Sequence, residues 1–180
     1  MDLHITDPEF VERFEHFAES EVPNDENGKL DEKTRYLAIL ATLIGVYQAT
    51  DYLGYGRILP FLNATNEILT DSGIELPLPG QATTTLDDRL EKGIEAQAEI
   101  FGEHMKETWR AGHINRWLAA NCFGDYYTRK GLNLSERELI TFCFLMAQGG
   151  CEPQLIAHAK GNMNMGNDKD FLIRVVSQCL

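Results

Sequence analysis

Residues 131–180 read GLNLSERELITFCFLMAQGGCEPQLIAHAKGNMNMGNDKDFLIRVVSQCL, and this stretch decides the fold class. Its apolar residues recur three and four apart, which is the spacing of one face of an α-helix. The segments with this spacing are 135–148, 153–165 and 169–180. The carboxyl-terminal part of the chain is therefore predicted to be three helices.

The boundaries of these segments carry signals for helix ends. Ser135 and Glu138 have the spacing of a capping box, in which two side chains bind the first free backbone N–H groups of a helix. Pro153 suits a first helical turn, where its missing N–H has no cost. Gly166, followed by Asn and Asp, is typical of one helix ending and the next beginning.

The rest of the chain has the same helical spacing, and strand signals are scarce. Further helices are predicted over 8–20, 30–53, 85–108 and 113–129. The stretch 70–84, TDSGIELPLPGQATT, is rich in turn residues and is expected to be a surface linker. The predicted fold class is all-α.

Composition narrows the kind of protein. The chain has 180 residues, of which 43% are hydrophobic and 24% charged, so it is long enough to bury one good core. No apolar run approaches the ~20 residues of a membrane span, so no membrane partner is expected. The net charge of −12 opposes binding to a phosphate backbone, and no basic stripe with aromatic residues is present. Nucleic acid is therefore not an expected partner.

The four cysteines, at positions 122, 143, 151 and 179, include no CxxC pair. This spacing does not resemble a secreted disulfide scaffold or a structural zinc site, so no metal is expected and a reducing cytoplasm fits best. The first residues, MDLHITDPEFVERFEHF, carry acids where a signal peptide has basic residues and an apolar core. A cytoplasmic location is expected.

The segment CEPQLIAH, residues 151–158, places a thiol and an imidazole around a predicted helix start. Cys151 is expected at the helix N-terminus, where the backbone dipole favours a thiolate. His158 follows seven residues later, which is almost two full turns, so both side chains are able to face one pocket. A reactive thiol site and a pair of structural core residues are both compatible with this spacing.

A weak internal repeat runs through the chain. LDEKTRYLAILATLIG from Leu30 aligns with LNLSERELITFCFLMA from Leu132 at an offset of 102 residues. Farther on, VYQATDYL from Val46 aligns with VSQCL from Val176 at an offset of 130 residues. The first copy therefore skips the part that corresponds to residues 148–175, which holds both Cys151 and His158. On this interpretation only the second copy carries a site.

The run from Gly131 to Leu180 resembles the carboxymuconolactone decarboxylase family, within the alkylhydroperoxidase D-like superfamily. The resemblance lies in an Arg-Glu-Leu helix at 137–139, a Cys/Gly-rich turn, a helix with a histidine, and the motif G-N-x-x-x-G at 161–166. TTTLDDRLEKGIEAQAEIFGE and NCFGDYYTRKGL resemble the connecting region of members with two tandem copies. VYQATDYLGYGRILPFLNATNEIL resembles the end of a first copy.

The resemblance implies an all-α, alkylhydroperoxidase D-like helical bundle in which two related helical units pack together. It divides the chain into N-terminal helices with a degenerate first copy (1–80), connecting helices (81–131) and a second copy with the site (132–180). It also implies self-association into a trimer or a hexamer-like assembly. The missing part of the first copy and the end at Leu180, where a helix like LGYGRILPFLNATNEI is expected to follow, strengthen this expectation, because both leave apolar faces to cover.

The family's decarboxylase activity implies a small carboxylated lactone as substrate and a proton donor. His158 is the expected acid or base, because imidazole titrates near neutrality, and Glu138 is placed to orient it. Arg137 is a candidate for a bidentate contact with a substrate carboxylate, and Asn162 and Asn164 are candidate donors. Arg137 and Glu138 are equally compatible with a capping box and a surface ion pair. No cofactor is required.

Aromatic residues ahead of the second copy are a further candidate lining of the site. Asp125, Tyr126 and Tyr127 lie together in CFGDYYTR, and aromatic residues at helical spacing are more often core than ligand contacts. Both interpretations are open.

The family's second activity is the reduction of hydroperoxides by a cysteine pair in a CxxCxxxH motif. Here Cys151 and His158 occupy the first and last positions, but Gln154 replaces the second cysteine. Cys143 lies in an apolar stretch and is expected in the core. Peroxiredoxin-type activity through Cys151 is therefore the second hypothesis, and a non-catalytic assembly protein of the same fold is the third.

Overall fold

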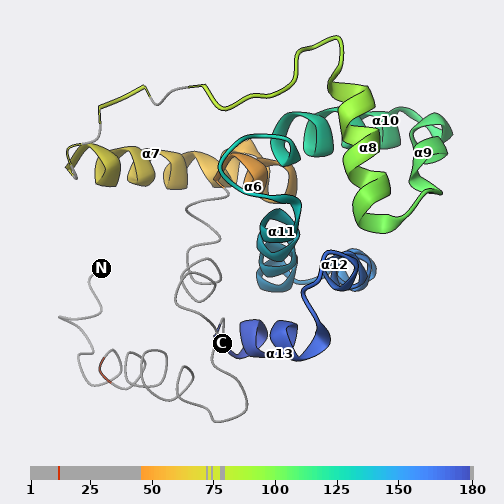
Figure 1. Cartoon of the computed structure of the whole chain (residues 1–180). Helices are drawn as coiled ribbons and strands as arrows, with labels where there is room; N and C mark the ends of the chain where they lie inside the picture. The colour runs from red at the N-terminus through yellow and green to blue at the C-terminus, as the bar shows by residue number, and fades with distance from the viewer. Residues whose placement is uncertain (1–11, 13–45, 72, 74, 78–79, 179–180) are drawn as a thin grey trace.

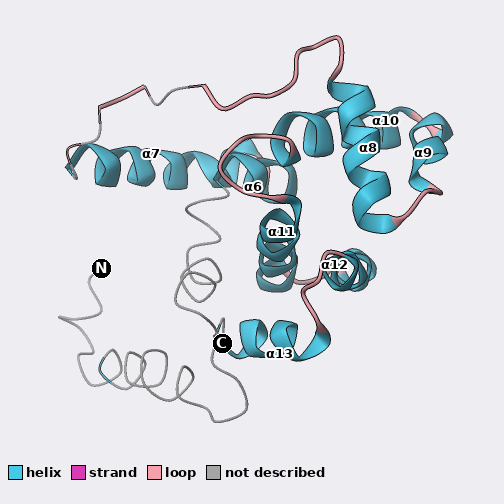
Figure 2. Cartoon of the chain, viewed as in Figure 1, coloured by secondary structure: helices cyan, strands magenta, loops and turns pink. Residues whose placement is uncertain are grey.

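The structure is a computed structural model that describes residues 12, 46–71, 73, 75–77 and 80–178. Within these ranges every regular element is a helix and no strand occurs, so the described part is an all-α bundle, as predicted (Figure 2). The helix predicted over 8–20, apart from residue 12, and the first part of the one predicted over 30–53 lie outside the described residues.

The helices are labelled as in Figure 1, and most of their bounds lie close to the predicted ones. They are α6 (Val46–Leu53), α7 (Tyr55–Asp71), α8 (Arg89–Phe101), α9 (Met105–Thr108), the 3₁₀ helix η2 (Trp109–Ala111), α10 (His113–Trp117), the π-helix η3 (Leu118–Tyr127), α11 (Leu134–Gln148), α12 (Glu152–Asn164) and α13 (Lys169–Gln178).

Three elements differ from the predicted ranges. The helix expected over 85–108 breaks after α8, because Gly102 has a φ of 108°, which no α-helix accommodates. The helix expected over 113–129 begins as α10 and continues as a π-helix, a rare form that inserts extra residues per turn. Helix α7 was not among the ranges that periodicity predicted, and it contains Pro60. Figure 1 shows α7 extending away from α8 to α12.

Helix α11 is the central element, and the capping box at its first turn differs from the predicted one. The N-cap residue is Asn133, whose side chain accepts from the Glu136 backbone N–H at 2.9 Å. The Glu136 carboxylate in turn accepts from the Asn133 backbone N–H at 3.0 Å. The predicted Ser135–Glu138 box is wrong, because the helix begins two residues earlier than that pairing requires. Glu138 is thereby free of a capping role and lies on the buried face of the helix.

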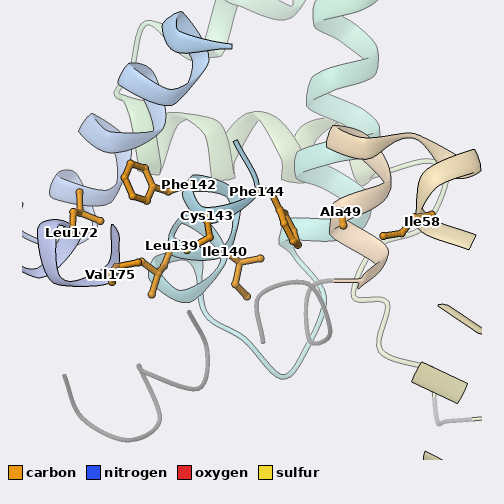
Figure 3. Close-up of a cluster of buried hydrophobic side chains, with 9 residues drawn as sticks. All are labelled: Ala49, Ile58, Leu139, Ile140, Phe142, Cys143, Phe144, Leu172 and Val175. Carbon is orange, nitrogen blue, oxygen red and sulfur yellow. The ribbon is translucent and has the colours of Figure 1, made fainter. Parts of the chain in front are cut away.

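The apolar side of α11 forms the main core with helices from both ends of the described chain. Figure 3 shows side chains of α11 lying between those of α13 on one side and those of α6 and α7 on the other. The buried members of this main core are Ala49, Ile58, Leu139, Ile140, Phe142, Cys143, Phe144, Leu172 and Val175. Cys143 is 5% exposed, which confirms that it is a core residue.

Helix α8 and η3 pack with their backbones almost in contact. A Cβ atom built on Gly93 of α8 would overlap the carbonyl oxygen of Ala119, and one built on Gly124 of η3 would overlap the carbonyl oxygen of Arg89. Two facing glycines therefore set the distance between these helices. Beside this contact lies a second core cluster of Ala96, Ile100, Cys122, Phe123 and Tyr127.

The segment between α7 and α8 runs over the surface, as expected for a linker. Its described residues at 75–77 and 80–83 are all exposed. Its end is fastened to the region after η3, since the Lys130 backbone N–H donates to the Gln81 carbonyl at 3.0 Å and the Thr83 hydroxyl donates to the Thr128 carbonyl at 2.7 Å. The linker thus returns the chain to the bundle just before α8 begins.

Candidate functional site

The centre of the candidate site is a pair formed by Glu138 of α11 and His158 of α12. The imidazole Nδ1 lies 2.8 Å from one carboxylate oxygen of Glu138 and 3.1 Å from the other. The Glu138 side chain has no exposed surface, whereas 12% of the His158 side chain is exposed. A buried carboxylate therefore contacts one nitrogen of a histidine whose ring still reaches the surface.

The opposite ring nitrogen of His158, Nε2, has no hydrogen bond to any residue in the described ranges. Two aromatic rings pack against the imidazole in T-shaped, nearly perpendicular arrangements. The Phe101 ring centroid lies 5.2 Å away with an interplanar angle of 83°, and the Tyr52 centroid lies 6.3 Å away at 85°. The arrangement fixes the ring orientation and leaves Nε2 as the atom available for proton transfer.

Gly161 allows α12 to approach Glu138 closely. A Cβ atom built there would lie 2.8 Å from a ring carbon of Phe101 and 3.0 Å from an oxygen of the Glu138 carboxylate. Both distances are shorter than normal carbon contacts, so a side chain at this position would displace the carboxylate or the ring. The glycine of the G-N-x-x-x-G motif is thus a packing requirement of the pair.

Behind Glu138 lies a buried hydrogen-bond network. The Tyr127 hydroxyl donates to Glu138 Oε1 at 3.0 Å and also contacts the Thr141 hydroxyl. The Thr141 hydroxyl donates to the Tyr52 hydroxyl at 3.2 Å, and Gln48 Nε2 donates to Thr141 Oγ1 at 2.7 Å. Four elements, α6, η3, α11 and α12, are joined through this network and the Glu138–His158 pair.

The network ends at a second group of titratable side chains. Tyr52 contacts the Cys122 thiol at 3.3 Å, and burial, reinforced by the charge of Asp51, raises the pKa of Cys122 well above its usual value. Desolvation of the Asp51 carboxyl raises its pKa to about 6, with a hydrogen bond to Cys122 opposing the shift and Asp125 adding to it. Although much of Asp51 is exposed, its carboxyl thus lies against Cys122.

Arg137 lies inside the protein rather than in a solvent-facing first turn. Only 5% of the residue is exposed, and burial lowers the pKa of its guanidinium to about 10. Its guanidinium donates to Gln48 Oε1 at 3.2 Å and to the carbonyl of Arg129 at 2.8 Å. The surface ion pair considered from the sequence is therefore wrong for Arg137, whose guanidinium joins α11 to α6 and to the segment after η3.

Asn162 and Asn164, the two candidate substrate donors, lie in different surroundings. Asn162 is fully buried and donates to the Glu138 carbonyl at 3.0 Å and the His158 carbonyl at 2.8 Å. Its own side-chain oxygen accepts from Asn167 Nδ2 at 2.8 Å. Asn162 therefore braces the backbones of the two residues of the pair, with its hydrogen-bonding groups already bound inside the protein.

Asn164 lines an open hollow of about 690 Å³ between α8, the segment 128–135 and the end of α12. Its side-chain nitrogen donates to the Ile100 carbonyl at 2.8 Å. Neither Glu138 nor His158 lines this hollow, but Tyr127 does. Tyr127 therefore lines the hollow and also contacts the Glu138 carboxylate.

Cys151 is the N-cap residue of α12, as expected, with Pro153 in the first turn. Its thiol is half-buried and contacts the carbonyl of Leu145 at 3.3 Å. No hydrogen bond joins it to His158 among the described residues. The structure thus brings Glu138, His158 and Asn162 into one group, whereas the Cys151 thiol contacts the Leu145 carbonyl of α11.

Of the aromatic stretch 125–127, only Tyr127 contacts the Glu138–His158 pair. Asp125 instead forms an ion pair with Arg89 of α8. Tyr52, Thr141 and Gln48 were not identified from the sequence. Tyr52 and Gln48 lie more than 100 positions from His158, and Thr141 lies inside an apolar helix pattern with no motif of its own. The only local signal was the presence of polar residues on otherwise apolar helix faces.

Two further searches concern the described residues alone. No three histidine, cysteine, aspartate or glutamate side chains converge there as a metal site. None of the helices described is both long enough and apolar enough to cross a membrane.

Comparison with known proteins finds one family and one curated relative. Residues 113–180 match the model of the carboxymuconolactone decarboxylase family. The chain is also 26% identical over 107 residues to a 4-carboxymuconolactone decarboxylase of Acinetobacter baylyi, with 52% of this chain and 73% of the relative covered. No solved structure matches. The part of the chain that holds Glu138, His158, Tyr127 and Cys151 is therefore similar to the carboxymuconolactone decarboxylase family.

Proposed function

We propose that this chain is a carboxymuconolactone decarboxylase-like enzyme that transfers a proton at His158 Nε2 to a small carboxylated lactone. The observation that carries the proposal is the contact of His158 Nδ1 with the fully buried Glu138 carboxylate, while Nε2 has no described protein partner. The match of residues 113–180 to the decarboxylase family supports the reaction type.

The chemistry follows from the roles of the two nitrogens. A carboxylate only accepts hydrogen bonds, so Nδ1 carries a proton and Glu138 stabilises the imidazolium. In the proposed reaction the bond from the substrate carbon to its carboxylate breaks, carbon dioxide leaves, and the electron pair remains on carbon. Nε2–H of the imidazolium then protonates that carbon, which leaves a neutral imidazole to be protonated again from water.

The test is turnover of 4-carboxymuconolactone by the purified chain, followed as release of carbon dioxide. His158→Gln is expected to lower kcat at least about 100-fold, because loss of a general acid typically costs that much. His113→Gln is the matched control, since His113 is exposed and packs on Trp117 instead of the pair. Equal turnover by wild type and His158→Gln would contradict the assignment of the proton donor.

A thiol-dependent hydroperoxide reductase is the second candidate, and one observation favours it. Cys151 occupies the N-cap position of α12, and its side chain is only half-buried, unlike those of Cys122 and Cys143. In this reaction the thiolate attacks a peroxide oxygen, the O–O bond breaks, and the alkoxide leaves as an alcohol after taking a proton from water. An added small thiol then forms a mixed disulfide with the sulfenic acid and releases water, and a second one reduces that disulfide to regenerate Cys151. A resolving cysteine within the chain is not required.

Sulfenic acid trapping tests the second candidate directly. After brief exposure to peroxide, dimedone labelling is expected to be fast at Cys151 and slow at Cys122 and Cys143, which are buried. Peptide mass spectrometry measures the labelling at each position. Equal and slow labelling at these three positions would make Cys151 a structural N-cap residue. It would contradict the hydroperoxide reductase activity and leave decarboxylation as the remaining proposed reaction.

A further inference from the structure

The hydroxyl of Tyr127 is the second donor to the carboxylate that holds His158. It donates to Glu138 Oε1 at 3.0 Å, while His158 Nδ1 lies 2.8 Å from Oε2. The two donors come from different elements, η3 and α12, and meet at a carboxylate on α11 that has no exposed surface.

The surroundings of Tyr127 keep its hydroxyl protonated, so that it remains a hydrogen-bond donor. Only 1% of the residue is exposed, and burial raises the pKa of its hydroxyl well above the usual value, with the nearby Tyr52 and Glu138 adding to the shift. The phenol therefore stays protonated. Its ring is fixed by Phe123, whose ring centroid lies 4.5 Å away, and its oxygen also contacts Thr141. The direction of its hydrogen bond is thus set by the packing around it.

From this geometry we propose that Tyr127 is a positioning residue that sets the protonation equilibrium of the Glu138–His158 pair. The proposal rests on the proposed function, since it assigns a task within the same site. Tyr127 touches no substrate on this account. It acts by binding the Glu138 carboxylate, which in turn holds His158.

The direction of the effect follows from the charge states of the pair. When His158 is an imidazolium, its positive charge balances the Glu138 carboxylate and the pair is neutral overall. When the imidazolium loses a proton, the pair keeps the negative charge of the buried carboxylate, and this anionic state depends most on the Tyr127 donor. Removing the hydroxyl destabilises the anionic state more than the neutral one, so the proton is held to higher pH. The other titratable groups that face the pair are Tyr52 of α6 and Cys122 of η3. Burial raises the pKa of both, so both remain neutral.

The experiment is an NMR titration of the His158 imidazole in wild type and Tyr127→Phe, with the resonance assigned through His158→Gln. The His158 resonance is expected to titrate at higher pH in Tyr127→Phe than in wild type, because the buried carboxylate has lost a donor. The limb of the kcat profile that reports His158 is expected to move by the same amount. Tyr126→Phe is the matched control, because Tyr126 is the neighbour on η3 and has no contact with Glu138 among its described interactions.

A second variant covers the case in which Tyr127→Phe does not fold. Incorporation of 3-fluorotyrosine at position 127 keeps the hydroxyl and makes it a stronger donor, so the His158 midpoint is expected to fall. An unchanged midpoint in both variants would overturn the proposal. A shifted midpoint in a protein that turns over no lactone would support the role of Tyr127 and reject the decarboxylase function, so the two failures are distinguishable.

Discussion

Gly93→Ala is expected to destabilise the protein by about 3 kcal/mol or more, which is a large part of the stability of a typical domain. The added Cβ would overlap the Ala119 carbonyl oxygen and lie 2.7 Å from the Gly124 backbone nitrogen. Both contacts are with backbone atoms, so relief requires α8 and η3 to move apart. Alanine is favoured over glycine inside a helix by about 1 kcal/mol, which is too little to offset the overlap.

The measurement is the free energy of unfolding from urea denaturation of the full chain. Gly56→Ala in α7 is the matched control, because its Cβ would meet no atom within 4 Å and its φ is ordinary for an L-residue. That variant is expected to be as stable as wild type or slightly more stable. If Gly93→Ala unfolded at the wild-type urea concentration, α8 and η3 would not pack at the distance described.

Glu138→Gln is expected to lower the proposed decarboxylase activity about 100-fold. Glutamine keeps the shape, but it removes the charge that favours the imidazolium and replaces one of the two acceptor oxygens with an NH₂ donor. His158 therefore loses the carboxylate that supports its role as the proton donor. The limb of the pH–rate profile that reports His158 is expected to move to lower pH, opposite to the shift in Tyr127→Phe. The variant is also expected to lose stability, because the amide NH₂ faces a donor where the carboxylate accepted from both Tyr127 and His158.

Glu136→Gln provides the control on the same helix. Glu136 accepts from the Asn133 backbone N–H as part of the capping box, and glutamine serves that position equally well. Its kcat and unfolding free energy are expected to match wild type. A Glu138→Gln enzyme with wild-type kcat and an unshifted profile would show that the carboxylate does not act through His158.

The local pattern of the sequence was sufficient for most of the helices. Helices α11, α12 and α13 lie within a residue or two of the predicted ranges, because their apolar spacing and their boundary residues agree. It was insufficient where one residue decides the backbone path, as at Gly102, which separates α8 from α9 through its positive φ. The cap of α11 was misplaced because Asn133 and Ser135 are both good capping residues, and only the packing of α11 selects between them.

The candidate site was likewise predicted in part from its sequence motif, and the rest of it depends on contacts through space. The motif around residues 137–166 pointed to Glu138 and His158, and the 26% identity to a decarboxylase agrees with the reaction class. The roles of Gly161 and Asn162 at the start of the G-N-x-x-x-G motif were not apparent, because these residues act through space on Glu138 and on backbone carbonyls. The organisation in two tandem copies and the self-association stay predictions.

The sequence by itself determined the all-α class, the helix boundaries with strong caps, and the placement of Cys151 at a helix start, since each depends on neighbours within a few residues. Only the tertiary structure decided that Arg137 is buried, that Tyr127 binds Glu138, and that the histidine contacts the carboxylate with Nδ1. These contacts join side chains 11 to 89 positions apart. Their existence depends on how closely α8, η3, α11 and α12 pack, which facing glycines and buried volumes determine and no local pattern encodes.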